Sequence, residues 1–325
     1  MNNFTYLQPK TLEEASQLLK EEGIQTIPFA GGTDALDLIK TDIINPNRVI
    51  NLKKISNLST IEYTAGKGLR IGTMVTIAEL AEHNLINEKY SVIAQAAKEI
   101  ASPQLRNVGT IGGNICQRPR CYYFREQFDC IRKGGDTCYA YQGYNKLHCV
   151  VGGGPCFIVH PSDMAVALLA LDAKVVIFSN GKSRTIPISK FFVLPEEDYL
   201  HENILKPGEI ITDFQISDLP INTKSGYLKF KERAAWDFAL VSIAAVIQMK
   251  GKIIQSGRVA LGGVAPIPWQ EEILNQKLAG LPADENAISQ WSKNALKKAD
   301  PLSLNSYKIQ LSQNLLKRLV NRLVS

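Results

Sequence analysis

Several features that mark well-known protein classes are missing from this sequence. No run of about 18 apolar residues occurs, which excludes a transmembrane helix. Residues Met1 to Tyr6 lack the charged and then apolar pattern of a secretory signal, so on its own the chain is expected in the cytoplasm. The net charge is +6 and the basic residues are scattered, which does not indicate a nucleic-acid-binding surface.

Common catalytic and nucleotide-binding signatures are missing as well. The sequence has neither the G-x-G-x-x-G dinucleotide fingerprint nor a G-x-x-x-x-G-K-S/T phosphate-binding loop. Its few histidines are dispersed and form no triad or metal-binding pattern: His83, His148, His160 and His201. A hydrolytic site is therefore not expected, and we predict no catalytic side chain.

Cysteine is absent from most of the chain and concentrated in one segment. All six cysteines lie between residues 116 and 156: Cys116, Cys121, Cys130, Cys138, Cys149 and Cys156. Disulfide scaffolds are typical of short secreted chains, so a metal or redox site is the better interpretation. Structural zinc sites usually show two close cysteine pairs, and only Cys116 and Cys121 are close here.

The apolar patterns divide the chain into three parts. With 325 residues, 45% of them hydrophobic, the chain is long enough for roughly two domains. Residues 1–55 alternate helix and strand, which predicts a small α/β lobe. Residues 56–220 predict a mixed central lobe, interrupted by a cysteine-rich insertion at 115–158 with little periodicity. Residues 221–325 predict an antiparallel meander followed by helices.

Two glycine segments suggest close contact between backbone and a ligand. They are Ala30–Asp34, between a predicted strand and helix, and Gly109–Asn114. Glycine has no Cβ and allows positive φ, and a helix that starts after such a turn offers free N–H groups to a phosphate. The plain alternative for either segment is a tight turn.

The ordered motifs resemble the FAD-binding medium subunits of the xanthine dehydrogenase and carbon monoxide dehydrogenase family. Ala30–Asp34 resembles the first FAD-binding motif of that family, and Thr110–Asn114 resembles the second. The resemblance continues through Pro161–Leu168, Tyr227–Lys229, Asp237–Ser242 and Val259–Pro266, and so spans nearly the whole chain.

This resemblance implies an α+β, FAD-binding fold of the PCMH (vanillyl-alcohol-oxidase-like) type. The N-terminal α/β lobe and the central α+β lobe would hold FAD between them, and the C-terminal lobe would combine an antiparallel sheet with helices. Asp163 and Lys229 match polar FAD-contacting positions; the alternatives are a helix-capping role for Asp163 and a solvent-facing strand position for Lys229. The predicted FAD-binding residues are Ile27, Pro28, Phe29, Ala30, Gly31, Gly32, Thr33, Asp34, Ala35, Thr110, Ile111, Gly112, Gly113, Asn114, Asp163 and Lys229.

The cysteine-rich insertion resembles two subgroups of the family that carry an extra 4Fe-4S cluster. These are the FAD subunit of periplasmic-type aldehyde oxidoreductases, which the segment Gln117–Phe124 fits more closely, and the β subunit of 4-hydroxybenzoyl-CoA reductase. The resemblance implies Cys121, Cys130, Cys138 and Cys156 as the four ligands. Cys116 and Cys149 are interpreted as small buried residues. Zinc remains the alternative metal.

The function implied by the resemblance is electron transfer within a larger complex. One partner subunit would hold the molybdenum cofactor and another the 2Fe-2S clusters, and FAD would pass electrons to an external acceptor. One alternative is a 4-hydroxybenzoyl-CoA reductase-type subunit with inward electron flow. Another is a non-catalytic, metal-binding assembly subunit with a degenerate flavin site, against which the intact glycine segments argue. Co-export with a signal-bearing partner would place the chain in the periplasm instead.

Overall fold

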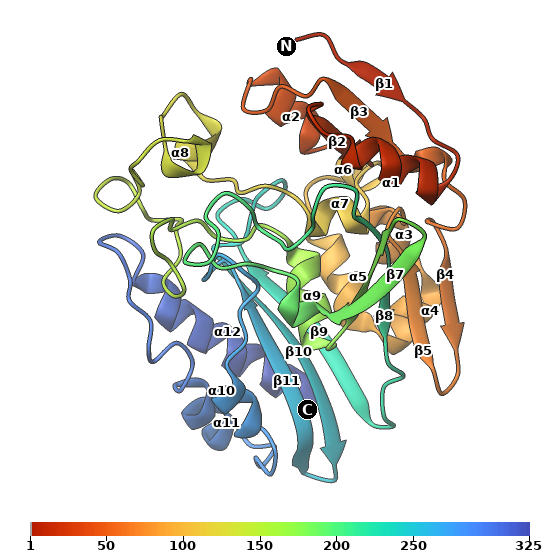
Figure 1. Cartoon of the computed structure of the whole chain (residues 1–325). Coiled ribbons are helices and arrows are strands. Elements are labelled where there is room, and N and C mark those ends of the chain that lie inside the picture. The colour runs from red at the N-terminus through yellow and green to blue at the C-terminus, as the bar shows by residue number, and fades with distance from the viewer. Residues whose placement is uncertain (1) are drawn as a thin grey trace.

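The computed structural model describes residues 2–325 and contains three separate β-sheets. The N-terminal lobe has a parallel sheet in the order β1-β3-β2, formed by Thr5–Leu7, Arg48–Asn51 and Thr26–Phe29. Helices α1 (Leu12–Lys20) and α2 (Ala35–Lys40) connect these strands. The Thr11 hydroxyl accepts a hydrogen bond from the Glu14 amide and so caps the start of α1. Figure 1 shows this lobe beside the central one.

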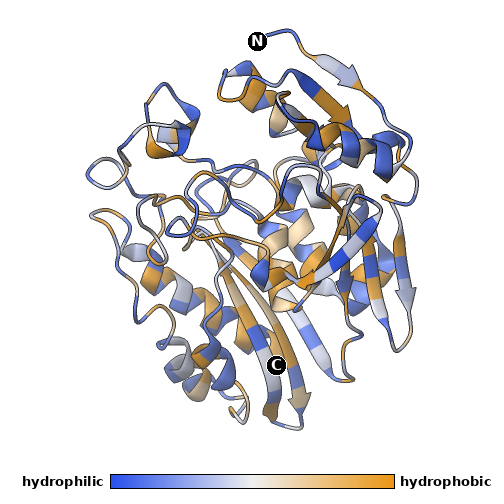
Figure 2. Ribbon diagram, viewed as in Figure 1, coloured by the Kyte–Doolittle hydropathy of each residue, from blue (hydrophilic) through white to orange (hydrophobic). Residues whose placement is uncertain are grey.

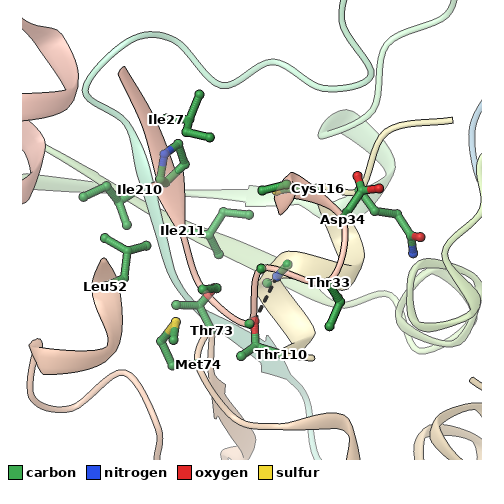
Figure 3. A pocket seen from close by; sticks show the side chains of 18 of the residues that line it. Ile27, Thr33, Asp34, Leu52, Thr73, Met74, Thr110, Cys116, Ile210 and Ile211 are labelled. Carbon is green, nitrogen blue, oxygen red and sulfur yellow. Dashed lines mark hydrogen bonds between the residues drawn. The ribbon is translucent and has the colours of Figure 1, made fainter. Parts of the chain in front are cut away.

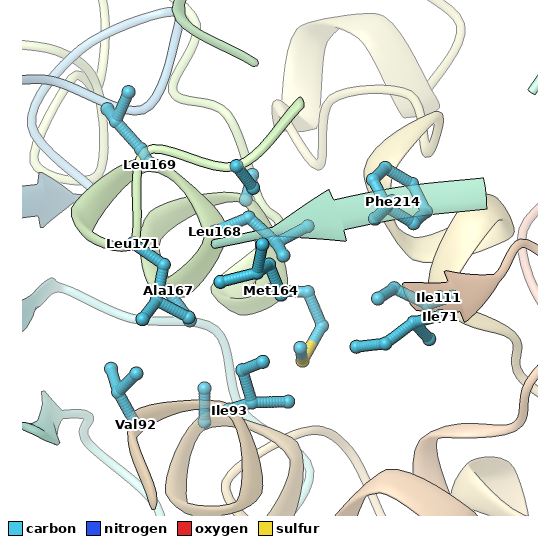
Figure 4. Close-up of a cluster of buried hydrophobic side chains, with 14 of the residues drawn as sticks. Ile71, Val92, Ile93, Ile111, Met164, Ala167, Leu168, Leu169, Leu171 and Phe214 are labelled. Atoms are coloured by element: carbon cyan, nitrogen blue, oxygen red, sulfur yellow. The ribbon is translucent and has the colours of Figure 1, made fainter. Parts of the chain in front are cut away.

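The central lobe is built on a five-stranded antiparallel sheet in the order β4-β5-β8-β6-β7. The strands are, in that order, Ile61–Thr64, Gly68–Gly72, Ile210–Ile216, Lys174–Ser179 and Lys182–Pro187. Its helices are α3 (Ile77–Glu82), α4 (Asn84–Lys89), α5 (Ser91–Lys98), α6 (Pro103–Arg106), α7 (Ile111–Ile115) and α9 (Asp163–Ala170). Helix α9 is buried along its whole length, and its Met164 and Leu168 contribute to the core drawn in Figure 4.

The C-terminal lobe confirms the predicted meander. Strands β9 (Thr223–Phe230), β10 (Val241–Lys250) and β11 (Ile253–Gly262) form an antiparallel sheet in the order β11-β10-β9. Helices α10 (Glu272–Gln276), α11 (Glu285–Ser292) and α12 (Tyr307–Val324) accompany it, and α12 packs on β10. Figure 2 shows hydrophobic residues along these strands, where they form the second core.

The insertion between α7 and α9 is mostly irregular, and helix α7 leads into it. Residues Ile111–Ile115 form helix α7, because the Thr110 hydroxyl caps it by accepting a hydrogen bond from the Gly113 amide. Helix propensity does not predict α7, because glycine, present here as Gly112 and Gly113, disfavours helix. Further on, the insertion contains only α8 (Tyr122–Arg125) and a short 3-10 turn at Ile131–Lys133.

Two sets of contacts fasten the insertion to the rest of the molecule. Phe124 and Cys130 pack with Leu38 of α2, which joins the insertion to the N-terminal lobe. On the other side, the buried Asn145 accepts from the Leu304 amide and donates to Ser303, just before α12. The insertion therefore lies between the first and last lobes. In the part of the chain described here, no helix is long and apolar enough to cross a membrane.

Candidate cofactor sites

The two glycine segments pack directly against neighbouring backbone. A Cβ on Gly31 would lie 2.1 Å from the Val108 carbonyl oxygen, and one on Gly112 would lie 1.9 Å from the Thr73 hydroxyl. Real Cβ atoms do not approach other atoms so closely, so both positions require glycine. The first segment therefore packs on the backbone that leads into the second, and the second packs on Thr73 after β5. Both segments contribute to the cavity in Figure 3.

Gly32 and Gly113 have different reasons for lacking a side chain. Gly32 has φ +74°, and a Cβ there would lie 2.3 Å from the ring of Phe29. A substitution at Gly32 would thus distort the loop itself, so it cannot separate cofactor binding from folding. At Gly113 the nearest atom to a Cβ would be the Thr110 hydroxyl at 3.2 Å, and the residue is exposed to the cavities.

Two cavities lie on either side of these segments. The larger, of about 320 Å³, is lined by both segments together with apolar residues of β8 and the preceding strands, as Figure 3 shows for Ile210, Ile211 and Leu52. The smaller, of about 230 Å³, reaches Asp163, Lys229 and Trp236. The cavities share Thr33, Asp34, Thr110, Gly113 and Gln117. An elongated molecule that crosses the glycine segments would occupy both.

The structure places most of the predicted FAD-binding residues on these two cavities. The larger is lined by Ile27, Pro28, Ala30, Gly31, Gly32, Thr33, Asp34, Ala35, Thr110, Gly112 and Gly113. Asn114, Asp163 and Lys229 line the smaller. Two of the predicted residues line neither cavity. Ile111 is fully buried in the central core, and the Phe29 ring packs edge-on against Tyr6. Alternation of side chains along strand and helix directs these two away from the cavities.

Asp163 and Lys229 form a buried ion pair on the wall of the smaller cavity. Lys229 Nζ lies 2.8 Å from Asp163 Oδ2, and the two side chains are only 1% and 6% exposed. Tyr227 donates to the other carboxylate oxygen of Asp163. The N-cap of α9 is Ser162, which leaves the Asp163 carboxylate free for this pairing. The solvent-facing alternative for Lys229 is therefore wrong.

Asp34 turns towards the insertion. Its carboxylate accepts hydrogen bonds from the Arg118 amide at 2.8 Å and from Arg125 Nη2 at 2.8 Å. Arg120 Nη2 also lies 2.8 Å from Asp34 Oδ1. Burial lowers the pKa of Arg120, and the charge of Asp34 opposes that effect. The first glycine segment is thus tied to the insertion by arginines that the insertion supplies.

Four of the six cysteines converge within the insertion. Cys121, Cys130, Cys138 and Cys156 line one small space of about 10 Å³, together with Arg132 and His148. All are free thiols. The other two lie apart from this space: Cys116 lines the larger cavity, and Cys149 is buried near Phe157. No group of three or more His, Cys, Asp or Glu side chains within residues 2–325 is arranged to hold a single metal ion.

The surroundings of the four cysteines carry one buried positive charge. A hydrogen bond from Cys138, and the charge and hydrogen bond of Arg132, lower the pKa of Cys156. Burial and the positive charge of Lys308 lower the pKa of His148 to about 4, so this neighbour is neutral at neutral pH. Burial and the charge of Arg132 lower the pKa of His160 to about 3.

Comparisons with known proteins agree with this geometry. Residues 2–217 match the FAD binding domain in molybdopterin dehydrogenase, and residues 226–323 match the CO dehydrogenase flavoprotein C-terminal domain. The chain is 38% identical to the aldehyde oxidoreductase FAD-binding subunit PaoB of Escherichia coli, over 97% of this chain and 96% of that protein. The chain belongs to the FAD-binding medium subunits of the xanthine dehydrogenase and CO dehydrogenase family.

Solved structures of FAD-subunit relatives share the fold. Carbon monoxide dehydrogenase from Hydrogenophaga pseudoflava matches with a TM-score of 0.78 and 24% identity, covering 98% of this chain and 96% of that chain. Quinoline 2-oxidoreductase from Pseudomonas putida matches with a TM-score of 0.77 and 21% identity, covering 99% and 97%. The predicted α+β, FAD-binding fold is confirmed, and the chain is an oxidoreductase subunit.

The residues of this FAD subunit fit the cofactor. Gly31 allows the first segment to lie against the backbone of Val108 and Gly109, and exposed Gly113 leaves open space between the two cavities. A dinucleotide has a ring system at each end and a pyrophosphate between them, which matches two cavities joined across glycine backbone.

Several residues that line the larger cavity of the FAD subunit are not among the predicted FAD-binding residues. Thr73 and Met74 follow β5. More than 130 positions later, Leu205 and Glu209 precede β8, and Ile210 and Ile211 begin it. Gln117 and Arg118 come from the insertion itself. No local motif marks the residues next to β5 and β8, because the pairing of these two strands brings them to the cavity.

Proposed function

We propose that this chain is the electron-transfer subunit of a molybdenum-containing aldehyde oxidoreductase, and that it carries both FAD and a 4Fe-4S cluster. In this proposal, a partner subunit with 2Fe-2S clusters delivers electrons that a molybdenum-cofactor subunit takes from the substrate. The identity to PaoB over nearly the full length of both chains supports the aldehyde oxidoreductase assignment. The convergence of four free cysteines supports the cluster.

FAD is proposed to cross the two glycine segments, with its pyrophosphate at Gly113 and one ring system in each cavity. Bound FAD stores two electrons and releases them to an external acceptor. In the smaller cavity, Asp163 and Lys229 neutralise each other's charge and hold their polar atoms in fixed positions. Because both side chains are already hydrogen-bonded, they present these groups to a ligand without a further ordering cost.

The cluster is proposed to bind Cys121, Cys130, Cys138 and Cys156. A single zinc ion needs its ligands to meet at one point, and the described residues hold no such group. A cubane instead accepts four thiolates spread around a larger centre. The small space between the sulfurs has to widen for this, and the irregular backbone of the insertion on both sides of α8 allows it.

The spectrum and the iron and sulfide content of the purified chain test this proposal. We expect flavin absorbance together with four irons and four sulfides per chain, the content of one cluster. Replacing any of the four converging cysteines with serine should lower iron and sulfide and destabilise the insertion, because cluster binding is coupled to folding.

Cys149→Ser and Cys116→Ser are the matched controls, since both are buried or partly buried thiols of the same region. They should keep iron and sulfide. Loss of the cluster in Cys149→Ser with retention in Cys156→Ser would contradict the ligand assignment. A chain that binds flavin but never iron would contradict the cluster itself, and substrate assays on the complex would separate aldehyde oxidation from reductive dehydroxylation.

A further inference from the structure

A buried carboxylate lies between the four cysteines and the larger cavity. Glu202, in the loop between β7 and β8, has a side chain that is only 4% exposed and contacts two guanidinium groups. Arg118 Nε lies 3.0 Å from Glu202 Oε1, and Arg132 Nη1 donates to the same oxygen. Glu202 belongs to none of the motifs in the sequence, yet it joins two arginines of the insertion.

Arg132 links Glu202 to the four cysteines. Its side chain is 2% exposed and lines the space between the four thiols, and its Nε has no hydrogen-bond partner in the structure. It is the one arginine or lysine among the described residues that line this space. Whatever the four sulfurs bind is therefore next to a permanent positive charge.

Arg118 links Glu202 to the larger cavity. It lines that cavity, its Nη2 donates to the Leu200 carbonyl at 2.9 Å, and its amide donates to Asp34 at 2.8 Å. Burial, and to a lesser extent the charge of Glu202, raise the pKa of Cys116, which lines the same cavity, to about 12. The negative charge of Glu202 thus reaches the cavity wall.

Charges held this way affect a redox centre strongly. Cluster potentials depend on net charge and on hydrogen bonds to the sulfurs. Buried charges are screened little by salt. The Glu202 carboxylate therefore offsets part of the positive charge of Arg132 beside the cysteines and of Arg118 beside the larger cavity. Removing the carboxylate would leave two uncompensated cations, and these favour an added electron.

We propose that Glu202 is a positioning residue that sets the reduction potentials of both cofactors, by holding Arg132 beside Cys156 and Arg118 at the wall of the larger cavity. The cluster half of this inference rests on the proposed 4Fe-4S site; the flavin half rests on the proposed placement of FAD, with its flavin ring in the larger cavity. Glu202 lines neither the larger cavity nor the space between the four cysteines, so it acts through the two arginines.

A redox titration of the full chain in its complex tests the proposal, with the cluster followed by electron paramagnetic resonance and the flavin by absorbance. Glu202→Gln should raise both midpoint potentials. For the cluster we expect a change of about tenfold in the ratio of reduced to oxidised protein, which is about 59 mV for one electron. Asp198→Asn is the matched control in the same loop, since Asp198 pairs with His201 at 2.8 Å on the surface. It should leave both potentials unchanged.

Arg132→Gln gives the opposite sign and keeps the test decisive if Glu202→Gln does not fold. This change removes the cation beside Cys156 but leaves the Glu202–Arg118 pair, so the cluster potential should fall while the flavin potential stays closer to that of the wild type. Wild-type potentials in both variants, at full cofactor content, would overturn the inference. If the wild-type chain contains no iron or sulfide, the cluster proposal fails, and an unchanged flavin potential in Glu202→Gln would then overturn the remaining half.

Discussion

Gly113 is the residue that best separates cofactor binding from folding. Gly113→Ala adds a Cβ whose nearest neighbour is the Thr110 hydroxyl at 3.2 Å, and Gly113 has no positive φ to lose. We expect the fold to survive while FAD affinity drops about tenfold or more, which corresponds to about 1.4 kcal/mol. Flavin content after dialysis and a fluorescence titration with added FAD would measure this.

Gly66→Ala is a suitable control, because its Cβ would meet no atom within 4 Å, although its φ of +78° carries some strain. It should lower stability slightly and leave FAD affinity unchanged. Full FAD affinity in Gly113→Ala would mean that the second glycine segment is only a turn.

His160 gives the protein a defined acid sensitivity. Its pKa falls from 6.5 to about 3 on folding, mainly through burial and also through the charge of Arg132. The unfolded chain therefore binds this proton first as the pH drops. The stability associated with His160 is complete above pH 6.5 and is lost as the pH falls towards 3.

His160→Asn should reduce this loss, because asparagine does not take up a proton in this pH range. Its amide oxygen keeps an acceptor near the position of Nδ1, which receives the Ser162 amide. Between pH 6 and 4 the free energy of unfolding should fall less steeply in the variant, by about 1.4 kcal/mol per pH unit. Urea unfolding at several pH values would measure the slopes. Parallel slopes would show that His160 takes up its proton in the folded state as readily as in the unfolded one.

At the scale of elements, the insertion depends on the segment that leads into α12. Asn145 is fully buried, donates to Ala140 and Ser303, and accepts from the Leu304 amide at 2.9 Å. Asn145→Ala leaves these groups unsatisfied, and each such buried group costs roughly 1–3 kcal/mol. We expect a destabilisation of about 2–4 kcal/mol, concentrated in the insertion.

Limited proteolysis would locate this effect. Cleavage should increase within residues 122–144 of Asn145→Ala before it increases elsewhere, while FAD remains bound. Asn314→Ala on the exposed face of α12 loses only a contact with Gln310 and should behave as the wild type does. Equal cleavage in both variants would show that the insertion holds its shape without Asn145.

At the scale of the whole molecule, membership of the FAD-binding medium subunits predicts that the chain works together with other subunits. We therefore expect the isolated chain to show no aldehyde-dependent reduction of an electron acceptor, and the assembled complex to show it. Assays of both preparations at matched flavin content would measure this, and substrate turnover by the isolated chain would contradict it.

Local sequence alone determined much of the architecture. Capping at Thr11, apolar periodicity and the alternation in β9 to β11 depend on neighbours in the chain, so the α/β start and the C-terminal meander could be predicted. The glycine segments could be found because glycine is required where backbones touch. The strands β1 and β7 were not predicted: the first has three residues, and the second is largely exposed and polar.

Only the tertiary structure decided which distant residues meet. The wall formed by Thr73 and Ile211 requires pairing of β5 with β8, and the ion pair of Asp163 with Lys229 requires α9 to pack near β9 and β10. Glu202 gave no signal at all, because a single glutamate in a loop is ordinary until two arginines from elsewhere enclose it. The physical reason is the same in each case: chain neighbours set local conformation, while charge compensation and cavity walls are set by contacts between segments far apart in sequence.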